Sequence, residues 1–277
     1  TWAIADLGVT LFATLCFAAV LNLWRGGDRR WLIASAVFAG LALGTKYTAV
    51  LVVCAPAAAA IALRPPAPGG GPGHRKRALV EAALFGGIAL ALVSPWLIRN
   101  AVFAGNPLAP YFSSVSASAG EDATPGISEE MARRLPREGG TSALLAHYLT
   151  APWRATMTRI GQGGYMGPAF LMLIPVLLLL RGLPSCAAPA VLMTATGCVA
   201  WAVSSQVVRY LFPLLPLAAL LAAIAARRLP KLLSVPALAW SLGYNLFLFF
   251  FLIETIGPLR VVTGAETADD YLARRVT

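Results

Sequence analysis

Residues 31–63, WLIASAVFAGLALGTKYTAVLVVCAPAAAAIAL, form an apolar run of 33 residues that contains a single charged side chain, Lys46. As one straight α-helix this run would be about 50 Å long, whereas the hydrocarbon core of a bilayer is about 30 Å thick. A lone lysine inside such a run is costly unless it lies near an interface or an aqueous cavity. We therefore predict a break at 44–47, which separates two membrane segments, 31–44 and 47–63.

The rest of the chain has the same apolar character. Hydrophobic residues make up 58% of the 277 residues and charged residues 12%, whereas about a quarter of the residues of a soluble domain are charged. This composition excludes a soluble enzyme fold, a disordered chain, a coiled coil and a disulfide scaffold. It predicts an all-α fold, a polytopic transmembrane helical bundle of about eight membrane segments. The predicted segments are 2–24, 31–44, 47–63, 78–98, 168–180, 186–204, 210–226 and 236–253.

Positive charge gathers in alternate loops between these segments. Eleven of the 22 basic residues fall in these loops, against one acid, Asp28. They are Arg25, Arg29, Arg30, Arg64, Arg75, Lys76, Arg77, Arg181, Arg227, Arg228 and Lys231. Because short loops rich in Lys and Arg mark the cytoplasmic side of a membrane protein, the pattern predicts the topology. The net charge of +10 is then explained by membrane lipids as partners, and we expect no nucleic acid.

The opposite, outer side receives the one long extracytoplasmic loop, 99–167. Its polar part, 113–140, is followed by 144–157, whose apolar spacing predicts a helix lying on the membrane interface. We divide the chain into four parts: membrane segments in 1–98, this loop in 99–167, membrane segments again in 168–253, and the start of an extracytoplasmic tail in 254–277.

Four charged side chains at the predicted outer ends of these segments are candidates for a functional site. They are Asp6, Lys46, Arg99 and Arg209. Each also has a simpler explanation, as an interfacial carboxylate, a snorkelling lysine or an arginine anchored at a helix end. Taken together, they place one carboxylate and several cations on one membrane face. Such a set suits a lipid-linked phosphate, which the cations neutralise while the carboxylate handles a proton or a metal.

Three ordered motifs resemble a known family of membrane enzymes. They are GLALGTKY at 40–47, PWLIRN at 95–100 with GNPLAP at 105–110, and RYLFPLLP at 209–216. In sequence and order they resemble the GT-C class of integral membrane glycosyltransferases that use polyprenyl-phosphate sugars. The likeness is greatest to the bacterial branch related to protein O-mannosyltransferases and to the lipid A aminoarabinose transferase.

The resemblance implies transfer of a sugar, with inversion, from a polyprenyl-phosphate-linked donor to a lipid, glycan or protein acceptor. The site would face the periplasm from a bacterial inner membrane. Lys46 and Arg209 match family positions near the donor phosphate, and Asp6 matches a secondary acid that handles the acceptor or a metal. The resemblance leaves a divalent metal open, and we expect no other cofactor. His74 and His147 are far apart in predicted loops and are not expected to form a metal site.

One departure from the family limits this expectation. The family's main catalytic aspartate lies in a first extracytoplasmic loop that has no counterpart in this sequence, so we expect a fragment that is inactive alone. Two alternatives stay open. One is a transporter or flippase of lipid-linked sugars, although such proteins tend to place charged sites at the membrane midplane between inverted repeats. The other is a non-catalytic membrane subunit.

Overall fold

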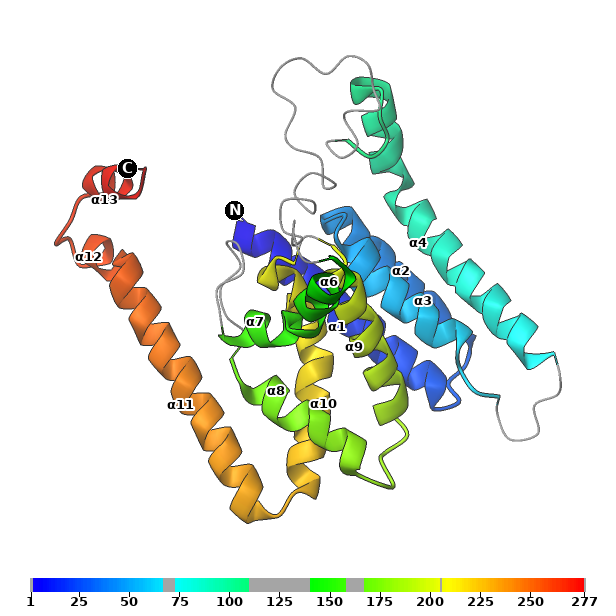
Figure 1. Cartoon of the computed structure of the whole chain (residues 1–277). Helices are drawn as coiled ribbons and strands as arrows, with labels where there is room; N and C mark the ends of the chain where they lie inside the picture. Colours follow the sequence, from blue (N-terminus) through cyan, green and yellow to red (C-terminus); the bar gives the residue numbers. More distant parts are fainter. Residues whose placement is uncertain (1, 67–72, 110–139, 158–166, 205, 277) are drawn as a thin grey trace.

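The computed structural model describes residues 2–66, 73–109, 140–157, 167–204 and 206–276 (Figure 1). Within these ranges the chain is helical and has no strand. The elements are α1 (Trp2–Trp24), α2 (Arg29–Thr45), the π-helix η1 (Val50–Cys54), α3 (Ala55–Ala62), α4 (His74–Ala104), α6 (Gly140–Leu149), α7 (Ala151–Met157), α8 (Ala169–Leu173), the 3₁₀ helix η3 (Ile174–Leu179), α9 (Ala187–Ala202), the 3₁₀ helix η4 (Val208–Leu214), α10 (Leu215–Arg228), α11 (Lys231–Ile256), α12 (Pro258–Val262) and α13 (Ala268–Val276).

The long apolar run is broken at the predicted place. Helix α2 ends at Thr45, and Lys46 has an extended backbone, with φ −161° and ψ 129°, while its N–H still donates to Ala42 O. After a short turn the chain re-enters the bundle as η1, which runs directly into α3. The lysine therefore lies at the end of a helix and not in the middle of one.

Four helices of the described chain are long and apolar enough to cross a membrane. They are Ala5–Trp24, His74–Ala104, Val208–Arg228 and Lys231–Thr255. Two shorter apolar helices, Val50–Ala62 and Ala187–Ala202, accompany them. The structure thus confirms an all-helical chain with membrane-spanning character, while the count of eight membrane segments remains a prediction. Most of the predicted extracytoplasmic loop, 110–139 and 158–166, lies outside the described residues.

Small side chains allow the helices of the bundle to pack closely. Helix α1 packs against α2, and α2 packs in turn against α4. Ala13 of α1 and Ala39 of α2 are fully buried. At Gly40 an added Cβ would lie 2.8 Å from Leu92 Cβ and 3.0 Å from Ala89 O, both on α4. In a membrane, where lipid is as apolar as leucine, this close contact between small residues holds helices together.

Helix α4 contains a proline, Pro95, yet continues beyond it. Proline lacks the N–H that would bond to the carbonyl four residues earlier, and here Ser94 Oγ donates to that carbonyl, Ala91 O, at 2.8 Å. The helix runs on to Ala104 and is capped by Gly105 at φ 64°. Arg99 therefore lies on a helix, past residue 98, the predicted end of this segment.

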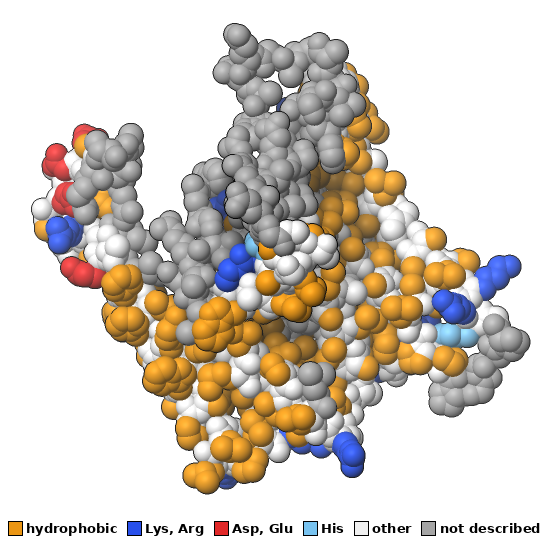
Figure 2. Space-filling model, viewed as in Figure 1, with side chains coloured by type: hydrophobic (Ala, Val, Ile, Leu, Met, Phe, Trp, Pro, Cys, Tyr) orange, Lys and Arg blue, Asp and Glu red, His pale blue; other side chains and the backbone are white. Residues whose placement is uncertain are grey.

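Hydrophobic side chains cover most of the lower part of the visible face, while Lys and Arg appear at its lower and right-hand edges, near its centre beside a histidine, and beside acidic side chains at the left (Figure 2). Helix α11 stands apart from the other helices (Figure 1), and only 6% of its most apolar stretch is buried. It touches the bundle near α8 and at Gly167, whose φ is 79° and whose missing Cβ leaves room for the Asn245 side chain. Most of α11 is therefore available to lipid.

Replacing Gly40 with alanine tests the packing of α2 on α4. Although alanine favours a helix by up to about 1 kcal/mol, we expect Gly40→Ala to destabilise the fold by about 1–3 kcal/mol, because the new methyl group overlaps Leu92 and the α4 backbone. Gly44→Ala is the matched control on the same helix, since a Cβ there meets nothing within 4 Å. Thermal unfolding in detergent measures both, and equal melting temperatures would contradict the packing.

Candidate functional site

Asp6 and Lys46 form an ion pair at one end of the bundle. Asp6 lies in the first turns of α1 and Lys46 directly follows α2. The two helices pack side by side, and Lys46 Nζ lies 2.5 Å from Asp6 Oδ1. The side chains are 23% and 11% exposed, respectively. The structure therefore brings together two of the predicted site residues, 40 positions apart in sequence.

The aromatic ring of Tyr210 joins this pair to a third predicted residue. Lys46 Nζ is 4.4 Å from the Tyr210 ring centroid, and Arg209 Cζ is 5.7 Å from the same centroid. Both distances are within the range of cation–π attraction, about 6 Å. Tyr210 and Arg209 belong to η4, which packs against α1 and η1. We call Asp6, Lys46, Arg209 and Tyr210 the polar cluster.

The polar cluster has one carboxylate and two cations, so its net charge is positive. The Lys46 ammonium has three N–H donors, one of which is used by Asp6. Arg209 carries a planar guanidinium, the group that binds phosphate oxygens in pairs. The half-buried position strengthens electrostatic interactions relative to bulk water. The arrangement is chemically suited to bind a phosphate group.

Arg99 lies apart from these contacts. Its guanidinium carbon is 5.0 Å from the Trp96 ring centroid and 5.7 Å from the Phe103 ring centroid, both on its own helix. Trp96 and Phe103 are exposed. These are the contacts of an arginine anchored at a membrane interface, and a role for Arg99 toward the donor phosphate remains a prediction.

Asn100 and Tyr47 were not recognised as site residues, although both belong to the motifs at 40–47 and 95–100. Asn100 is buried, and its Nδ2 donates to Tyr47 Oη at 2.8 Å and to Ala109 O at 3.2 Å. The first bond ties the residue after Lys46 to the C-terminal end of α4. Asn100 thereby helps to hold the turn between α2 and η1, which contains Lys46.

A second polar group, also missed, surrounds His147 on α6. Arg154 of α7 places Nη1 3.0 Å from His147 Nδ1 and donates from Nη2 to His147 O at 2.7 Å. Gln206 Nε2 lies 2.9 Å from His147 Nε2 and donates to Ala202 O at 2.8 Å. The segment 144–157, predicted as one helix, forms two helices, α6 and α7. The hydrogen bonds around His147 join these two helices to the end of α9.

Gln206 has a backbone φ of 53°, in the left-handed region that residues other than glycine seldom adopt. Its side chain is buried and bridges His147 to the end of α9. Trp201 Nε1 adds a bond to Val207 O at 2.9 Å. Side chains from α6, α7 and α9 thus hold the turn that leads into η4, and with it Arg209 and Tyr210.

An apolar cavity of about 510 Å³ lies beside this turn. Its walls come from α6 and α7 (Tyr148, Pro152), α8 (Phe170), α9 (Thr194) and the segment of η4 that follows Tyr210 (Leu211, Leu214). The polar cluster and an apolar chamber therefore share η4. Among the described residues, no three His, Cys, Asp or Glu side chains come together as a metal site, and the choice of metal stays open.

A double-mutant cycle measures the ion pair. We expect Asp6→Asn and Lys46→Met each to lower the thermal stability in detergent, because each leaves a partly buried charge without its partner. The double variant should recover part of the loss, with a coupling of about 0.5–3 kcal/mol. The same cycle on Asp28 and Arg30, a pair with 50% and 90% exposed side chains, should show smaller coupling. Equal coupling in the two cycles would contradict a buried pair.

NMR of the two histidines tests the His147 centre. Burial lowers the pKa of His147 and the Arg154 guanidinium lowers it further, while the hydrogen bond with Gln206 partly opposes this shift. The Arg154 guanidinium, which faces Nδ1, is a donor only, so a proton on Nδ1 of an imidazolium ring lacks an acceptor there. Since the unfolded chain binds this proton more readily, stability should fall as the pH drops through about 6.5, the unfolded pKa of histidine.

We expect the His147 ring signal to titrate below this value, and Arg154→Met to raise its pKa part of the way back. His74→Asn identifies the remaining signal as that of His147. An unchanged titration in Arg154→Met would show that the guanidinium does not act on the ring.

Comparison of the chain with known protein families, with curated proteins and with solved structures gave no match. The GT-C likeness therefore rests on the three motifs alone.

Proposed function

We propose that this protein is a GT-C glycosyltransferase of a bacterial inner membrane, which moves a sugar with inversion from a polyprenyl phosphate to an acceptor on the periplasmic face. The observation that carries the proposal is the pairing of Lys46 with Asp6 beside Tyr210 and Arg209. Three residues of two separate family-like motifs, 40–47 and 209–216, thus contribute to one cluster.

Lys46 and Arg209 bind the donor phosphate in this proposal. As the bond between the sugar and the phosphate breaks, negative charge grows on the departing polyprenyl phosphate. Cations already fixed in place stabilise that charge more in the transition state than in the bound donor. Asp6 holds the Lys46 ammonium in position, so we assign it as a positioning residue.

The general base is a different group. We assign it to the aspartate that the resemblance places in the family's first extracytoplasmic loop. That carboxylate would take the proton from the acceptor nucleophile while the acceptor attacks the anomeric carbon from the face opposite the phosphate. Inversion follows from this single displacement. The sugar, the acceptor and a divalent metal remain open.

The apolar cavity supports a lipid-linked donor over a soluble one. A polyprenyl phosphate combines an anionic head with an isoprenoid tail, and the molecule offers a polar cluster and an apolar cavity of about 510 Å³ that share η4. Binding sites of this kind are lined mostly by apolar side chains, with a few polar groups that fix orientation. Tyr148 and Leu211 would contact the first isoprene units.

Transfer from radiolabelled polyprenyl-phosphate sugars, extracted from the source bacterium, tests the proposal. The protein, expressed from its complete natural reading frame, is reconstituted in liposomes with a membrane extract as the source of acceptors. We expect Lys46→Met to lower the rate of label transfer by about 10²–10³-fold, the usual effect of removing one preorganised charge donor. Lys231→Met, which removes an exposed lysine elsewhere, should leave the rate unchanged.

The same liposomes separate the alternatives. If label crosses the membrane without forming a covalent product, the protein is a transporter of lipid-linked sugars. If neither transfer nor crossing occurs although the donor binds, it is a non-catalytic subunit. Unchanged transfer in Lys46→Met would remove Lys46 from the site and defeat the assignment.

A further inference from the structure

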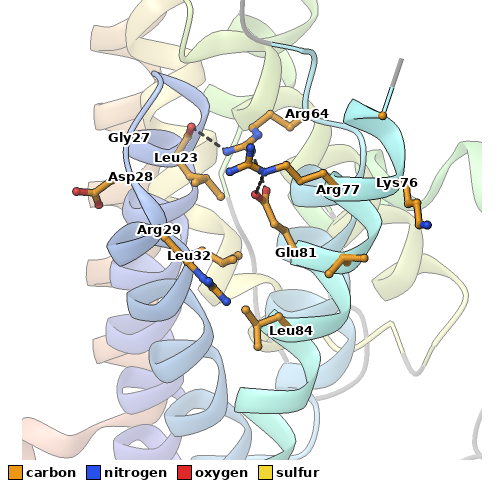
Figure 3. A pocket seen from close by; sticks show the side chains of 12 residues that line it. Leu23, Gly27, Asp28, Arg29, Leu32, Arg64, Lys76, Arg77, Glu81 and Leu84 are labelled. Atoms are coloured by element: carbon orange, nitrogen blue, oxygen red, sulfur yellow. Dashed lines mark hydrogen bonds and ion pairs between the residues drawn. The ribbon is translucent and has the colours of Figure 1, made fainter. Parts of the chain in front are cut away.

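A second cavity, of about 500 Å³, lies at the positively charged end of the bundle. It is bounded by the turn between α1 and α2 on one side and by the first turns of α4 on the other (Figure 3). The cavity borders the loops predicted to be cytoplasmic. The polar cluster, at the opposite ends of α1 and α2, has no part in it.

A network of charged side chains forms one wall of this cavity. Arg64 Nη2 lies 2.7 Å from Glu81 Oε2, and Arg77 Nε lies 3.2 Å from Glu81 Oε1. Arg64 Nη1 also donates to Leu23 O at 3.3 Å. Arg64 and Glu81 are largely buried, with 16% and 17% of their side chains exposed. This wall is therefore built and held in place by hydrogen bonds.

Arg29 faces this wall from α2. Its side chain reaches into the space between the two helices, whereas Lys76 points away from Glu81 (Figure 3). The lining includes four cations against two carboxylates. Both carboxylates are already engaged, Glu81 by Arg64 and Arg77, and Asp28 by Arg30. The net charge of the lining is positive, which favours an anion.

The rest of the lining is apolar. Leu32 of α2, which is 1% exposed, and Leu84 of α4 line it, together with Val80, which is 59% exposed. A free inorganic anion would use only the arginines. An amphipathic anion would use both parts, its phosphate at the arginines and its acyl chains along the exposed apolar side chains such as Val80. Basic pockets between membrane helices on the cytoplasmic side are typical binding places for such headgroups.

We propose that this cavity binds the phosphodiester headgroup of an anionic phospholipid of the cytoplasmic leaflet. Arg29 and Arg77 contact the phosphate, and Glu81 positions Arg77 through its hydrogen bond. The site is separate from the proposed donor site and does not depend on the glycosyltransferase assignment.

Native mass spectrometry of the delipidated full chain with phosphatidylglycerol tests the proposal. We expect one phosphatidylglycerol to bind in preference to phosphatidylcholine. Arg29→Gln and Arg77→Gln should each weaken that binding about fivefold, the effect of about one basic residue near a membrane surface. Arg181→Gln, which removes an exposed arginine from another loop on the same side, is the matched control and should bind as the unsubstituted chain does.

Cross-linking with a photoactivatable phosphatidylglycerol locates the lipid. We expect label on α2 and the first turns of α4, and its loss in the double variant Arg29→Gln/Arg77→Gln. Equal binding of phosphatidylcholine, an equal loss in Arg181→Gln, or displacement of the lipid by inorganic phosphate at comparable concentration would each overturn the proposal. Retained binding together with failed glycosyl transfer would count only against the proposed function.

Discussion

A charged lysine within a long apolar run is the constraint on which this structure depends. Lipid cannot solvate an ammonium, so Lys46 must lie where it finds both a counter-charge and the membrane edge. The chain meets this need by ending α2 at Thr45 and by placing Asp6 of α1 beside the ammonium. The π-helix after the turn then starts the return path through the bundle. The charge of Lys46 thus explains both the break after α2 and the formation of the polar cluster.

The bundle carries opposite chemistry at its two ends. At one end, the polar cluster of Asp6, Lys46, Arg209 and Tyr210 contains a partly buried ion pair. An apolar cavity is lined in part by η4, the helix that carries Arg209 and Tyr210. At the other end, Arg64 and Arg77, from two separate segments, both bind the Glu81 carboxylate. Both ends combine fixed cations with apolar walls, so both suit amphipathic anions on opposite membrane faces.

The sequence allowed the helical class, the break at Lys46 and the location of Asp6 and Lys46 at the same end of the bundle to be predicted, because these follow from hydropathy and topology. The ion pair between them was not predicted. It did not allow the contacts of Tyr210, Asn100 or Gln206 to be predicted. Helices that are apolar on every side give no periodic signal of which face meets protein and which meets lipid. The orientation of η4 in the bundle and the positive φ of Gln206, which lies just before this helix, depend on tertiary contacts. Arg99 was predicted to belong to the site because it lies in the motif at 95–100, but its aromatic contacts are with Trp96 and Phe103 of its own helix and not with the polar cluster.

Helix α11 adds a mechanical consequence. The span Lys231–Thr255 is about 37 Å long at 1.5 Å per residue, which exceeds the thickness of a typical hydrocarbon core. A helix held by many neighbours takes its inclination from them, but α11 touches little besides α8 and the Gly167 contact. With few packed neighbours, α11 can tilt to fit its length to the hydrocarbon core. A change in bilayer thickness would therefore alter the tilt of α11 more readily than that of the helices packed inside the bundle.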